Sequence, residues 1–262
     1  MFQIDTAAEV LLRLCDAARP IVRDHWLSPK QVDYKSDGSL LTQADLAVER
    51  LLRDGLRAAF PDHGLLGEEY GADAAERDYT WVIDPIDGTR PYGFGLPNFA
   101  SLAALCHHGR PILGMIDLPL LDVRYIGIAG QGTWLNGRKL QVSATKQLSQ
   151  AHGMLANHDS FTDGTDAAYD ALRARLRATA FDGGSPAYGA LAAGKIDLCL
   201  NGPDLNAHDI CALVPVVEGA GGVVTSWQGE PLTLASSGAI VASATAQLHD
   251  AALTEIAGAM TP

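Results

Sequence analysis

The sequence predicts a fold in two halves, an α+β half over residues 1–145 and an α/β half over residues 146–262. In the first half, two segments with helical spacing of apolar residues precede a long strand-like region, Tyr79–Val142. This pattern predicts two helices packed on a largely antiparallel sheet. In the second half, short apolar runs alternate with helical segments, which is typical of an α/β layer. With 262 residues, 47% of them hydrophobic, the chain can bury a large core.

The first half is expected to begin with two helices. Apolar residues fall near helical spacing from about Thr6 to Trp26, and the turn-rich segment Lys35–Ser39 follows. A second helix is expected to start at Thr42, because Thr42-Gln43-Ala44-Asp45 resembles a capping box with Asp at its last position. Apolar residues then recur at every fourth position along that helix.

Two hairpins are expected in the strand-like region. The segments Phe99–Cys106 and Ile112–Ile116 flank a short polar turn, which suits a hairpin. Asn136-Gly137, between Trp134-Leu135 and Leu140–Val142, is the sequence signal of a type I′ turn.

The second half is expected to alternate strands and helices from a polar junction near residues 143–152. The expected elements are a strand starting at Met154-Leu155, a helix over Asp166–Arg177, a strand over Ile196–Leu200, a helix over Asp209–Gly219, strands over Gly222–Thr225 and Ile240–Ala242, and a helix over Ala246–Ala259.

Composition narrows the classes of partner. A net charge of −12 opposes binding to nucleic acids and to anionic membranes, and an anionic substrate would need bound cations. The N-terminus carries no signal-peptide pattern, and no apolar run approaches the roughly 20 residues that span a bilayer. The four cysteines are scattered without a C-x-x-C pair, which predicts buried free thiols and a cytoplasmic protein.

The segment Trp81–Gly95, which reads WVIDPIDGTRPYGFG, is the most informative part of the sequence. An apolar run stops at Asp84, and a second carboxylate, Asp87, follows three residues later beside a Gly-Thr step. Such a pair could hold hard cations and seat a phosphate on backbone N–H groups. The alternative is a strand followed by an ordinary Asp-Pro, Asp-Gly turn, and the segment alone leaves both interpretations open.

Three other acidic segments stand where an element begins or ends, and such places commonly line active sites. Glu68 and Glu69 follow an apolar pair, Asp209 opens a predicted helix, and Asp45 lies in the first turn of another. Oxygen ligands favour Mg²⁺, Mn²⁺ or Ca²⁺ over zinc. Each position also has a simpler interpretation, namely a solvated charge pair, a residue favoured by the helix dipole and a capping residue.

Taken together, these segments resemble the inositol monophosphatase family of Mg²⁺-dependent phosphatases over most of the chain. The resemblance implies a layered αβαβα sandwich of the sugar-phosphatase type, and family members are often homodimers. The matching segments are Gly67-Glu68-Glu69 (G-E-E), Asp84–Thr89 (D-P-[IL]-D-G-T), Lys35-Ser36-Asp37 with Thr42–Asp45 (K-x-D…T-x-x-D), and Ala207-His208-Asp209 with Glu218–Gly222 (W-D, a helix, then E-A-G-G).

The resemblance implies two or three Mg²⁺ ions per site, with Mn²⁺ as a substitute. Glu68 and Asp84, with the main-chain carbonyl of Ile86, correspond to the ligands of one ion. Asp84, Asp87 and Asp209 correspond to the ligands of a second, and Glu68 also contacts a third, weaker ion in such a site.

The same resemblance implies how the phosphate and the attacking water are held. Backbone N–H groups of Gly88 and Thr89 would bind the phosphate, and Pro91 suits the first turn of a helix that begins there. Thr89, with Asp45 and Glu68, would activate the water for in-line attack on phosphorus.

Within the family, several segments resemble the histidinol-phosphatase branch. Arg90 follows the D-G-T element where inositol phosphatases usually carry Thr, and it is a candidate substrate contact. The segments Gly95–Pro97, Gly114–Pro119, Ile210–Gly222 and Thr225–Gly229 point the same way.

Two departures bear on the substrate. The branch carries an acid after a Gly pair, whereas Gly183–Tyr188 has Ser185 after the pair and Asp182 before it. A substrate-contacting Glu usually precedes the last metal ligand, whereas here Asp204 stands in an altered segment. Ser185, Asp204 and His208, which replaces the family's aromatic residue, are the further candidate substrate contacts; Asp204 could equally be a solvated turn residue and His208 a space-filling one.

The expected activity is Mg²⁺-dependent hydrolysis of a small phosphate monoester, and a histidinol-phosphate-like compound is the preferred candidate substrate. The alternatives are inositol 1-phosphate, or a sugar or nucleotide phosphate. A different class, a non-catalytic phosphometabolite-binding protein, is suggested by the altered segment Asn201–His208. It is disfavoured because every carboxylate that the resemblance assigns to the metals is present.

Overall fold

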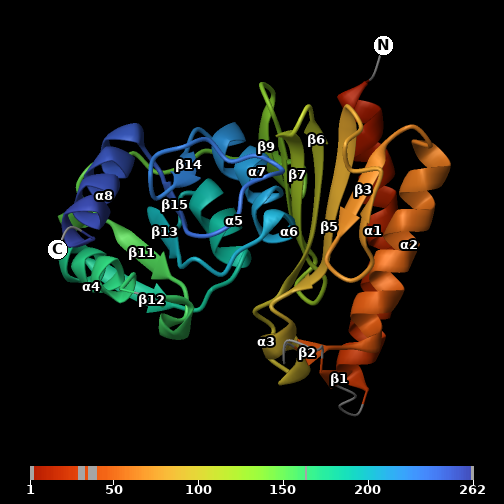
Figure 1. Ribbon diagram of the computed structural model, residues 1–262, viewed down its shortest axis with the longest axis horizontal. Helices are drawn as coiled ribbons and strands as arrows, with labels where there is room; N and C mark the ends of the chain where they lie inside the picture. Colours follow the sequence, from red (N-terminus) through yellow and green to blue (C-terminus); the bar gives the residue numbers. More distant parts are fainter. Residues whose placement is uncertain (1–2, 29–32, 35–39, 163, 261–262) are drawn as a thin grey trace.

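The structure, a computed structural model, describes residues 3–28, 33–34, 40–162 and 164–260. Figure 1 shows five layers in the order helix pair, large sheet, central helices, smaller sheet and outer helix pair. This arrangement confirms the predicted αβαβα sandwich. The turn-rich segment Lys35–Ser39, with its K-x-D motif, lies outside the described residues.

The first layer consists of α1 (Ile4–Leu27) and α2 (Gln43–Ala59). The predicted capping box is confirmed, because Asp45 N donates to Thr42 Oγ1 over 3.4 Å and Thr42 N donates to Asp45 Oδ2 over 2.8 Å. The apolar stripe of α2 is buried against the large sheet, so amphipathic spacing decides which face of the helix turns inward. Between the two helices, β1 (Asp33–Tyr34) and β2 (Leu40–Leu41) form a short antiparallel ladder.

The larger sheet has eight strands in the described residues, in the order β10-β9-β8-β7-β6-β5-β3-β4, and only β3 and β5 pair in parallel. Its strands are β3 (Gly64–Gly67), β4 (Gly71–Asp73), β5 (Tyr79–Asp87), β6 (Ala100–His107), β7 (Arg110–Leu118), β8 (Val123–Ile128), β9 (Gly132–Leu135) and β10 (Arg138–Lys139).

Both predicted hairpins are confirmed. His108-Gly109 joins β6 to β7 with φ of 47° and 77°, and Asn136-Gly137 joins β9 to β10 with φ of 47° and 82°, as type I′ turns require. The predicted strand over Leu140–Val142 is wrong. The second hairpin strand ends at Lys139, and Val142 N donates instead to the Ala220 carbonyl over 3.1 Å.

The smaller sheet has the order β12-β11-β13-β15-β14 within the described residues, with parallel pairs on both sides of β11 and antiparallel pairs elsewhere. Helices α4 and α8 cover its outer face (Figure 1). Met154-Leu155 ends β11 instead of starting it, and β12 was not predicted from the sequence. The elements of this half are η1 (Leu148–Gln150), β11 (His152–Leu155), η2 (His158–Ser160), α4 (Asp166–Arg175), β12 (Ala178–Phe181), β13 (Leu198–Asn201), β14 (Val223–Ser226), β15 (Ile240–Ser243) and α8 (Ala246–Ala259).

The central layer holds α5 (Pro186–Ala192), α6 (Ala207–Ile210) and α7 (Leu213–Gly219) between the two sheets. The single helix predicted over Asp209–Gly219 is therefore wrong. Pro215 has no N–H to donate to the carbonyl four residues earlier, which ends helical bonding between α6 and α7.

Close packing of the central helices on the large sheet depends on two glycines. A Cβ on Gly114 would lie 2.2 Å from the Ala212 carbonyl oxygen, and one on Gly127 would lie 2.1 Å from the Pro215 carbonyl oxygen. Any larger residue in these strands would push the helices off the sheet.

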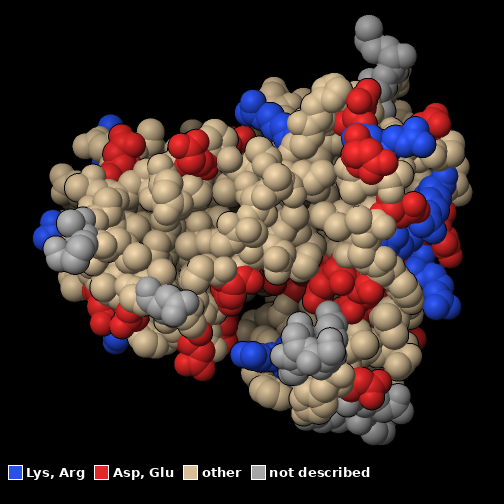
Figure 2. Space-filling model, in the orientation of Figure 1, with Lys and Arg blue, Asp and Glu red and all other residues tan. Residues whose placement is uncertain are grey.

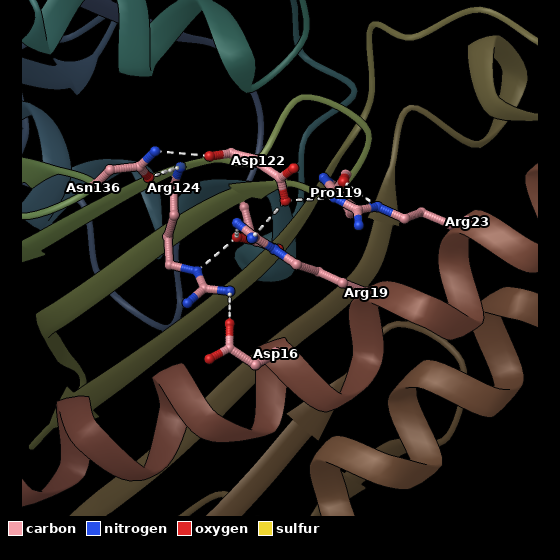
Figure 3. A network of polar contacts seen from close by, with 8 residues as sticks. Asp16, Arg19, Arg23, Pro119, Asp122, Arg124 and Asn136 are labelled. Carbon is pink, nitrogen blue, oxygen red and sulfur yellow. Dashed lines mark hydrogen bonds and ion pairs between the residues drawn. The ribbon is translucent and has the colours of Figure 1, made fainter.

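A charged network ties α1 to β7 and β8 on the other face of that sheet (Figure 3). Asp117 is buried and accepts hydrogen bonds from Arg19 Nη2 over 2.7 Å and from Arg124 Nε over 2.6 Å. Arg124 also donates to Asp16 over 2.8 Å. The four cysteines, all within the described ranges, are buried and free, as predicted.

Candidate active site

The pair Asp84 and Asp87 lies at the end of β5, where pairing with β6 shifts register between these two residues. In a regular strand, residues three apart point to opposite faces. The irregularity changes this direction, as bulges beside functional sites commonly do. Ser101 Oγ fixes it by donating to the Pro85 carbonyl over 2.6 Å, and Ile86 N donates to Asp84 Oδ1 over 3.0 Å.

Asp209 joins this pair from the other half of the chain. Carboxylate oxygens of Asp84, Asp87 and Asp209 all lie within 4.8 Å of one another. Asp209 is the third residue of α6, where its carboxylate closes a capping box by accepting from Asn206 N over 2.7 Å. The sequence left open whether Asp84–Thr89 is an ordinary turn or part of a binding site. Both interpretations hold, because the turn directs the Asp84 and Asp87 carboxylates toward Asp209.

Glu68 lies beside the same cluster. It follows β3, which pairs in parallel with β5, and its N–H donates to the Ile83 carbonyl over 3.1 Å, one residue before Asp84. Glu68 lines the same cavity as Asp87 and Asp209.

Asp45 is both the capping residue and a candidate active-site acid, the two interpretations that the sequence left open. It caps α2 through Oδ2, which accepts from Thr42 N and Oγ1, and the residue is fully buried. Its Oδ1 is buried and has no hydrogen-bond partner among the described residues. Burial raises the pKa of Asp45 to about 6 against the hydrogen bonds from Thr42, and the charge of Glu68 adds to the rise.

The segment after Asp87 forms α3 (Thr89–Gly93), with Gly88 as its N-terminal cap at a φ of 89°. Only glycine takes this left-handed conformation without strain. Thr89 Oγ1 donates to the Ile86 carbonyl over 3.1 Å, so the hydroxyl and the carbonyl that the resemblance assigns to the site are adjacent.

Burial, together with repulsion between neighbouring charges, raises the pKa values of the carboxylates in the cluster. The pKa of the fully buried Asp84 lies well above its usual range because of burial and the charges of Glu68 and Asp87. Burial also raises the pKa of Asp87, and burial with the charge of Asp87 raises the pKa of Asp209 to about 8. Several carboxylates that resist ionisation together form a donor set that a divalent cation would satisfy.

The cluster opens into a cavity of about 470 Å³ between the two halves of the chain. Figure 2 shows acidic side chains gathered around a hollow in the middle of the molecule, with a basic group at its edge. Arg90 and Asp204, both sequence candidates, line the cavity with exposed side chains.

Ser185 and His208, the two other substrate-contact candidates from the sequence, do not line the cavity as Arg90 and Asp204 do. Ser185 is buried, and its N–H donates to Asp87 Oδ2 over 3.0 Å, so the residue supports a carboxylate of the cluster. His208 lies beside Asp209, with 3.5 Å between Nε2 and Oδ2, and it is not among the described residues that line the cavity.

Sequence reasoning missed other residues that line this cavity. Asp159 and Asp182 add exposed carboxylates to its rim. Asn98, which follows α3 in the chain, also lines the cavity. Asn98 Nδ2 donates to the Asp182 carbonyl over 3.3 Å across the two halves. The signal in the sequence for Asp182 was its place before a Gly pair. In the structure it adopts a φ of 56°, a conformation that Asp tolerates better than most residues.

Comparison with known proteins agrees with this geometry. The model of the inositol monophosphatase family matches residues 3–260. The chain is 35% identical to the chloroplastic bifunctional phosphatase IMPL2 of Arabidopsis thaliana, over 97% of this chain and 76% of that protein. It is 30% identical to a histidinol-phosphatase of Chlorobaculum parvum, over 90% of this chain and 91% of that protein.

A solved structure has the same fold. An inositol monophosphatase from Zymomonas mobilis superposes with a TM-score of 0.89 at 32% identity, and the match covers 98% of this chain and 100% of that structure. In the described residues, no helix is both long and apolar enough to cross a membrane. The chain belongs to the inositol monophosphatase family, whose members are phosphatases.

Proposed function

We propose that this chain is a Mg²⁺-dependent phosphomonoesterase whose preferred substrate is histidinol phosphate or a closely similar amino-alcohol phosphate. The observation that carries the metal-dependent reaction is the convergence of Asp84, Asp87 and Asp209, whose carboxylate oxygens lie within 4.8 Å of one another. The donor set consists of oxygen atoms, which Mg²⁺ and Mn²⁺ prefer.

The residues present fit such ions. Glu68 and Asp84, with the Ile86 carbonyl, would hold one ion, and Asp84, Asp87 and Asp209 a second; a third would lie at Glu68. When bound, the ions offset the charge of the phosphoryl group and lower the pKa of water. Burial, with repulsion from neighbouring carboxylates, raises the pKa values of Asp84 and Asp209, and a bound divalent cation would favour their ionised forms, which supports this assignment.

The protein's own groups would then bind phosphate and orient water. N–H groups of Gly88 and Thr89 would bind phosphate oxygens. The Thr89 hydroxyl, with Glu68 and Asp45 Oδ1, would orient the attacking water and take its proton, which suits a buried carboxyl with a pKa of about 6. The water oxygen would form a bond to phosphorus while the ester bond breaks, and the leaving alkoxide would take one proton from solvent.

The rim supports a cationic leaving alcohol. Asp159, Asp182 and Asp204 all line the cavity with exposed carboxylates, and Arg90 is at the same opening. An ammonium or imidazolium group would find a carboxylate partner there, whereas inositol carries no charge to use them. Asp159 and Asp182 would compensate for the lost acid after the Gly pair, and Asp204 would take the part of the usual Glu in the altered Asn201–His208 segment.

A substrate panel with and without EDTA tests this proposal. Histidinol phosphate, inositol 1-phosphate, fructose 1,6-bisphosphate and adenosine 3′,5′-bisphosphate are compared by phosphate release. We expect the highest kcat/KM for histidinol phosphate in Mg²⁺ and no turnover in EDTA. Higher kcat/KM for inositol 1-phosphate would refute the substrate, and full turnover in EDTA would refute the metal-dependent reaction.

We also propose a cytoplasmic homodimer with a division of the chain near residue 145. Light scattering coupled to size exclusion tests the dimer, and limited proteolysis tests the division. A monomeric mass over the working concentration range would contradict the dimer.

A further inference from the structure

A buried ion pair of α2, Glu49 with Arg53, lies against the segment that carries Glu68. Glu49 is fully buried and Arg53 is 5% exposed. Arg53 Nε donates to Glu49 Oε1 over 2.8 Å. Neither residue is part of the motifs that resemble the family, and Glu49 is not among the described residues that line the cavity.

The Glu49 carboxylate binds the backbone that follows Glu68. Glu69 N donates to Glu49 Oε2 over 2.8 Å, and Tyr70 N donates to Glu49 Oε1 over 3.1 Å. Arg53 completes the contact by donating through Nη2 to the Gly71 carbonyl. The ion pair therefore holds three consecutive residues that lead from the turn after β3 into β4.

The residue before Glu68 packs on the same carboxylate. A Cβ on Gly67 would lie 1.9 Å from Glu49 Oε1, so a larger residue there would displace the Glu49 carboxylate. Glu68 itself is tied to β5 by its N–H, which donates to the Ile83 carbonyl over 3.1 Å. Glu68 is thus held between β5 on one side and Glu49 on the other.

A buried ion pair is a poor source of stability, because removing both charges from water offsets most of their attraction. A positional role is the better explanation for a carboxylate whose remaining hydrogen bonds all go to one turn. We propose that Glu49, supported by Arg53, is a positioning residue that fixes the Glu68 backbone so that the Glu68 side chain can bind metal. This inference rests on the proposed role of Glu68 as a metal ligand.

The test is direct metal binding to the full chain carrying Glu49→Gln. Glutamine keeps the size of the side chain, but its NH₂ group deprives one of the three N–H donors of its acceptor. After treatment with EDTA and its removal, calorimetric titration with Mn²⁺ should give a Kd raised about tenfold, as outer contacts of metal sites commonly do. The Mg²⁺ concentration for half-maximal activity should rise in parallel, while kcat at saturating Mg²⁺ changes much less. Hydrogen exchange at the Glu69 and Tyr70 amides should also accelerate.

Two variants separate this role from general destabilisation. Asp117→Asn breaks the other buried Arg–carboxylate cluster, at α1, and should lower the melting temperature without changing the Kd for Mn²⁺. Arg53→Lys, a milder change that keeps the charge near Glu49, should raise the Kd by a smaller factor and serves if Glu49→Gln does not fold. An unchanged Kd in both α2 variants, or an equal rise in Asp117→Asn, would overturn the inference.

Glu68→Gln distinguishes this inference from the proposed function. If Glu68→Gln weakens Mn²⁺ binding and the α2 variants do not, the positioning role alone fails. If Glu68→Gln leaves binding unchanged, the ligand role of Glu68 fails and the positioning role fails with it.

Discussion

Replacing Asp209 by Asn is expected to stabilise the metal-free protein while it abolishes the metal-dependent activity. Burial and the charge of Asp87 raise the pKa of Asp209 from 3.8 to about 8 in the fold. The folded protein therefore binds this proton more tightly than the unfolded chain, and stability is lost as pH rises from about 4 to about 8. Asparagine removes the charge and keeps an oxygen that can accept from Asn206 N.

The magnitude follows from the size of the shift. At pH 7, which lies about three units above the unfolded pKa of 3.8 and below the folded pKa of about 8, keeping Asp209 protonated costs the fold about 1.4 kcal/mol per unit, or ~4 kcal/mol. Because Asp84 and Asp87 share the titration, we expect the variant to recover about half of this, ~2 kcal/mol. At pH 5 the gain should fall below about 1 kcal/mol.

Urea unfolding in EDTA at pH 7 and pH 5 measures both values. Excess Mg²⁺ should reverse the order of stability, since the ions bind the wild-type fold more tightly than the variant. Asp204→Asn, at the exposed rim, is the matched control and should stay within about 0.5 kcal/mol of wild type. The reasoning is refuted if Asp209→Asn is no more stable than wild type in EDTA at pH 7, or if its gain is the same at pH 5.

The remaining predictions concern the site and its support. Asp87→Asn should lower kcat by about 10³-fold or more with an unchanged circular dichroism spectrum, because the variant loses a charge shared by the metals; full activity at saturating Mg²⁺ would contradict the assignment. Gly114→Ala should destabilise the fold by about 1–3 kcal/mol, because its Cβ would meet the Ala212 carbonyl at 2.2 Å, and thermal unfolding at wild-type stability would count against this packing. Asp182→Asn should raise KM for histidinol phosphate roughly fivefold, the effect of about 1 kcal/mol from an exposed ion pair, and leave KM for inositol 1-phosphate unchanged; equal effects on both substrates would remove the cationic-subsite argument.

Local signals in the sequence predicted many elements well. The capping box at Thr42 and the Asn136-Gly137 turn depend on short-range hydrogen bonds and backbone preferences, and both are present in the structure. The helix Ala246–Ala259 has its predicted bounds. Two missed elements have causes that the local sequence does not carry. The strand β12 is an edge strand with little burial, and Val142 leaves the large sheet to donate to the Ala220 carbonyl in the other half.

The sequence by itself determined which residue types could hold metal, the turn chemistry around Asp84–Thr89, and the family resemblance that fixed the reaction class. Only the tertiary structure brought Asp209 to Asp84 and Asp87 and showed the irregularity of β5 that changes the relative direction of Asp84 and Asp87. It also revealed Asp159 and Asp182 at the rim and Glu49 behind Glu68. The physical reason is range: caps and turns are encoded within a few residues, whereas a metal cluster, its electrostatic repulsion and its supporting contacts arise where distant segments pack together.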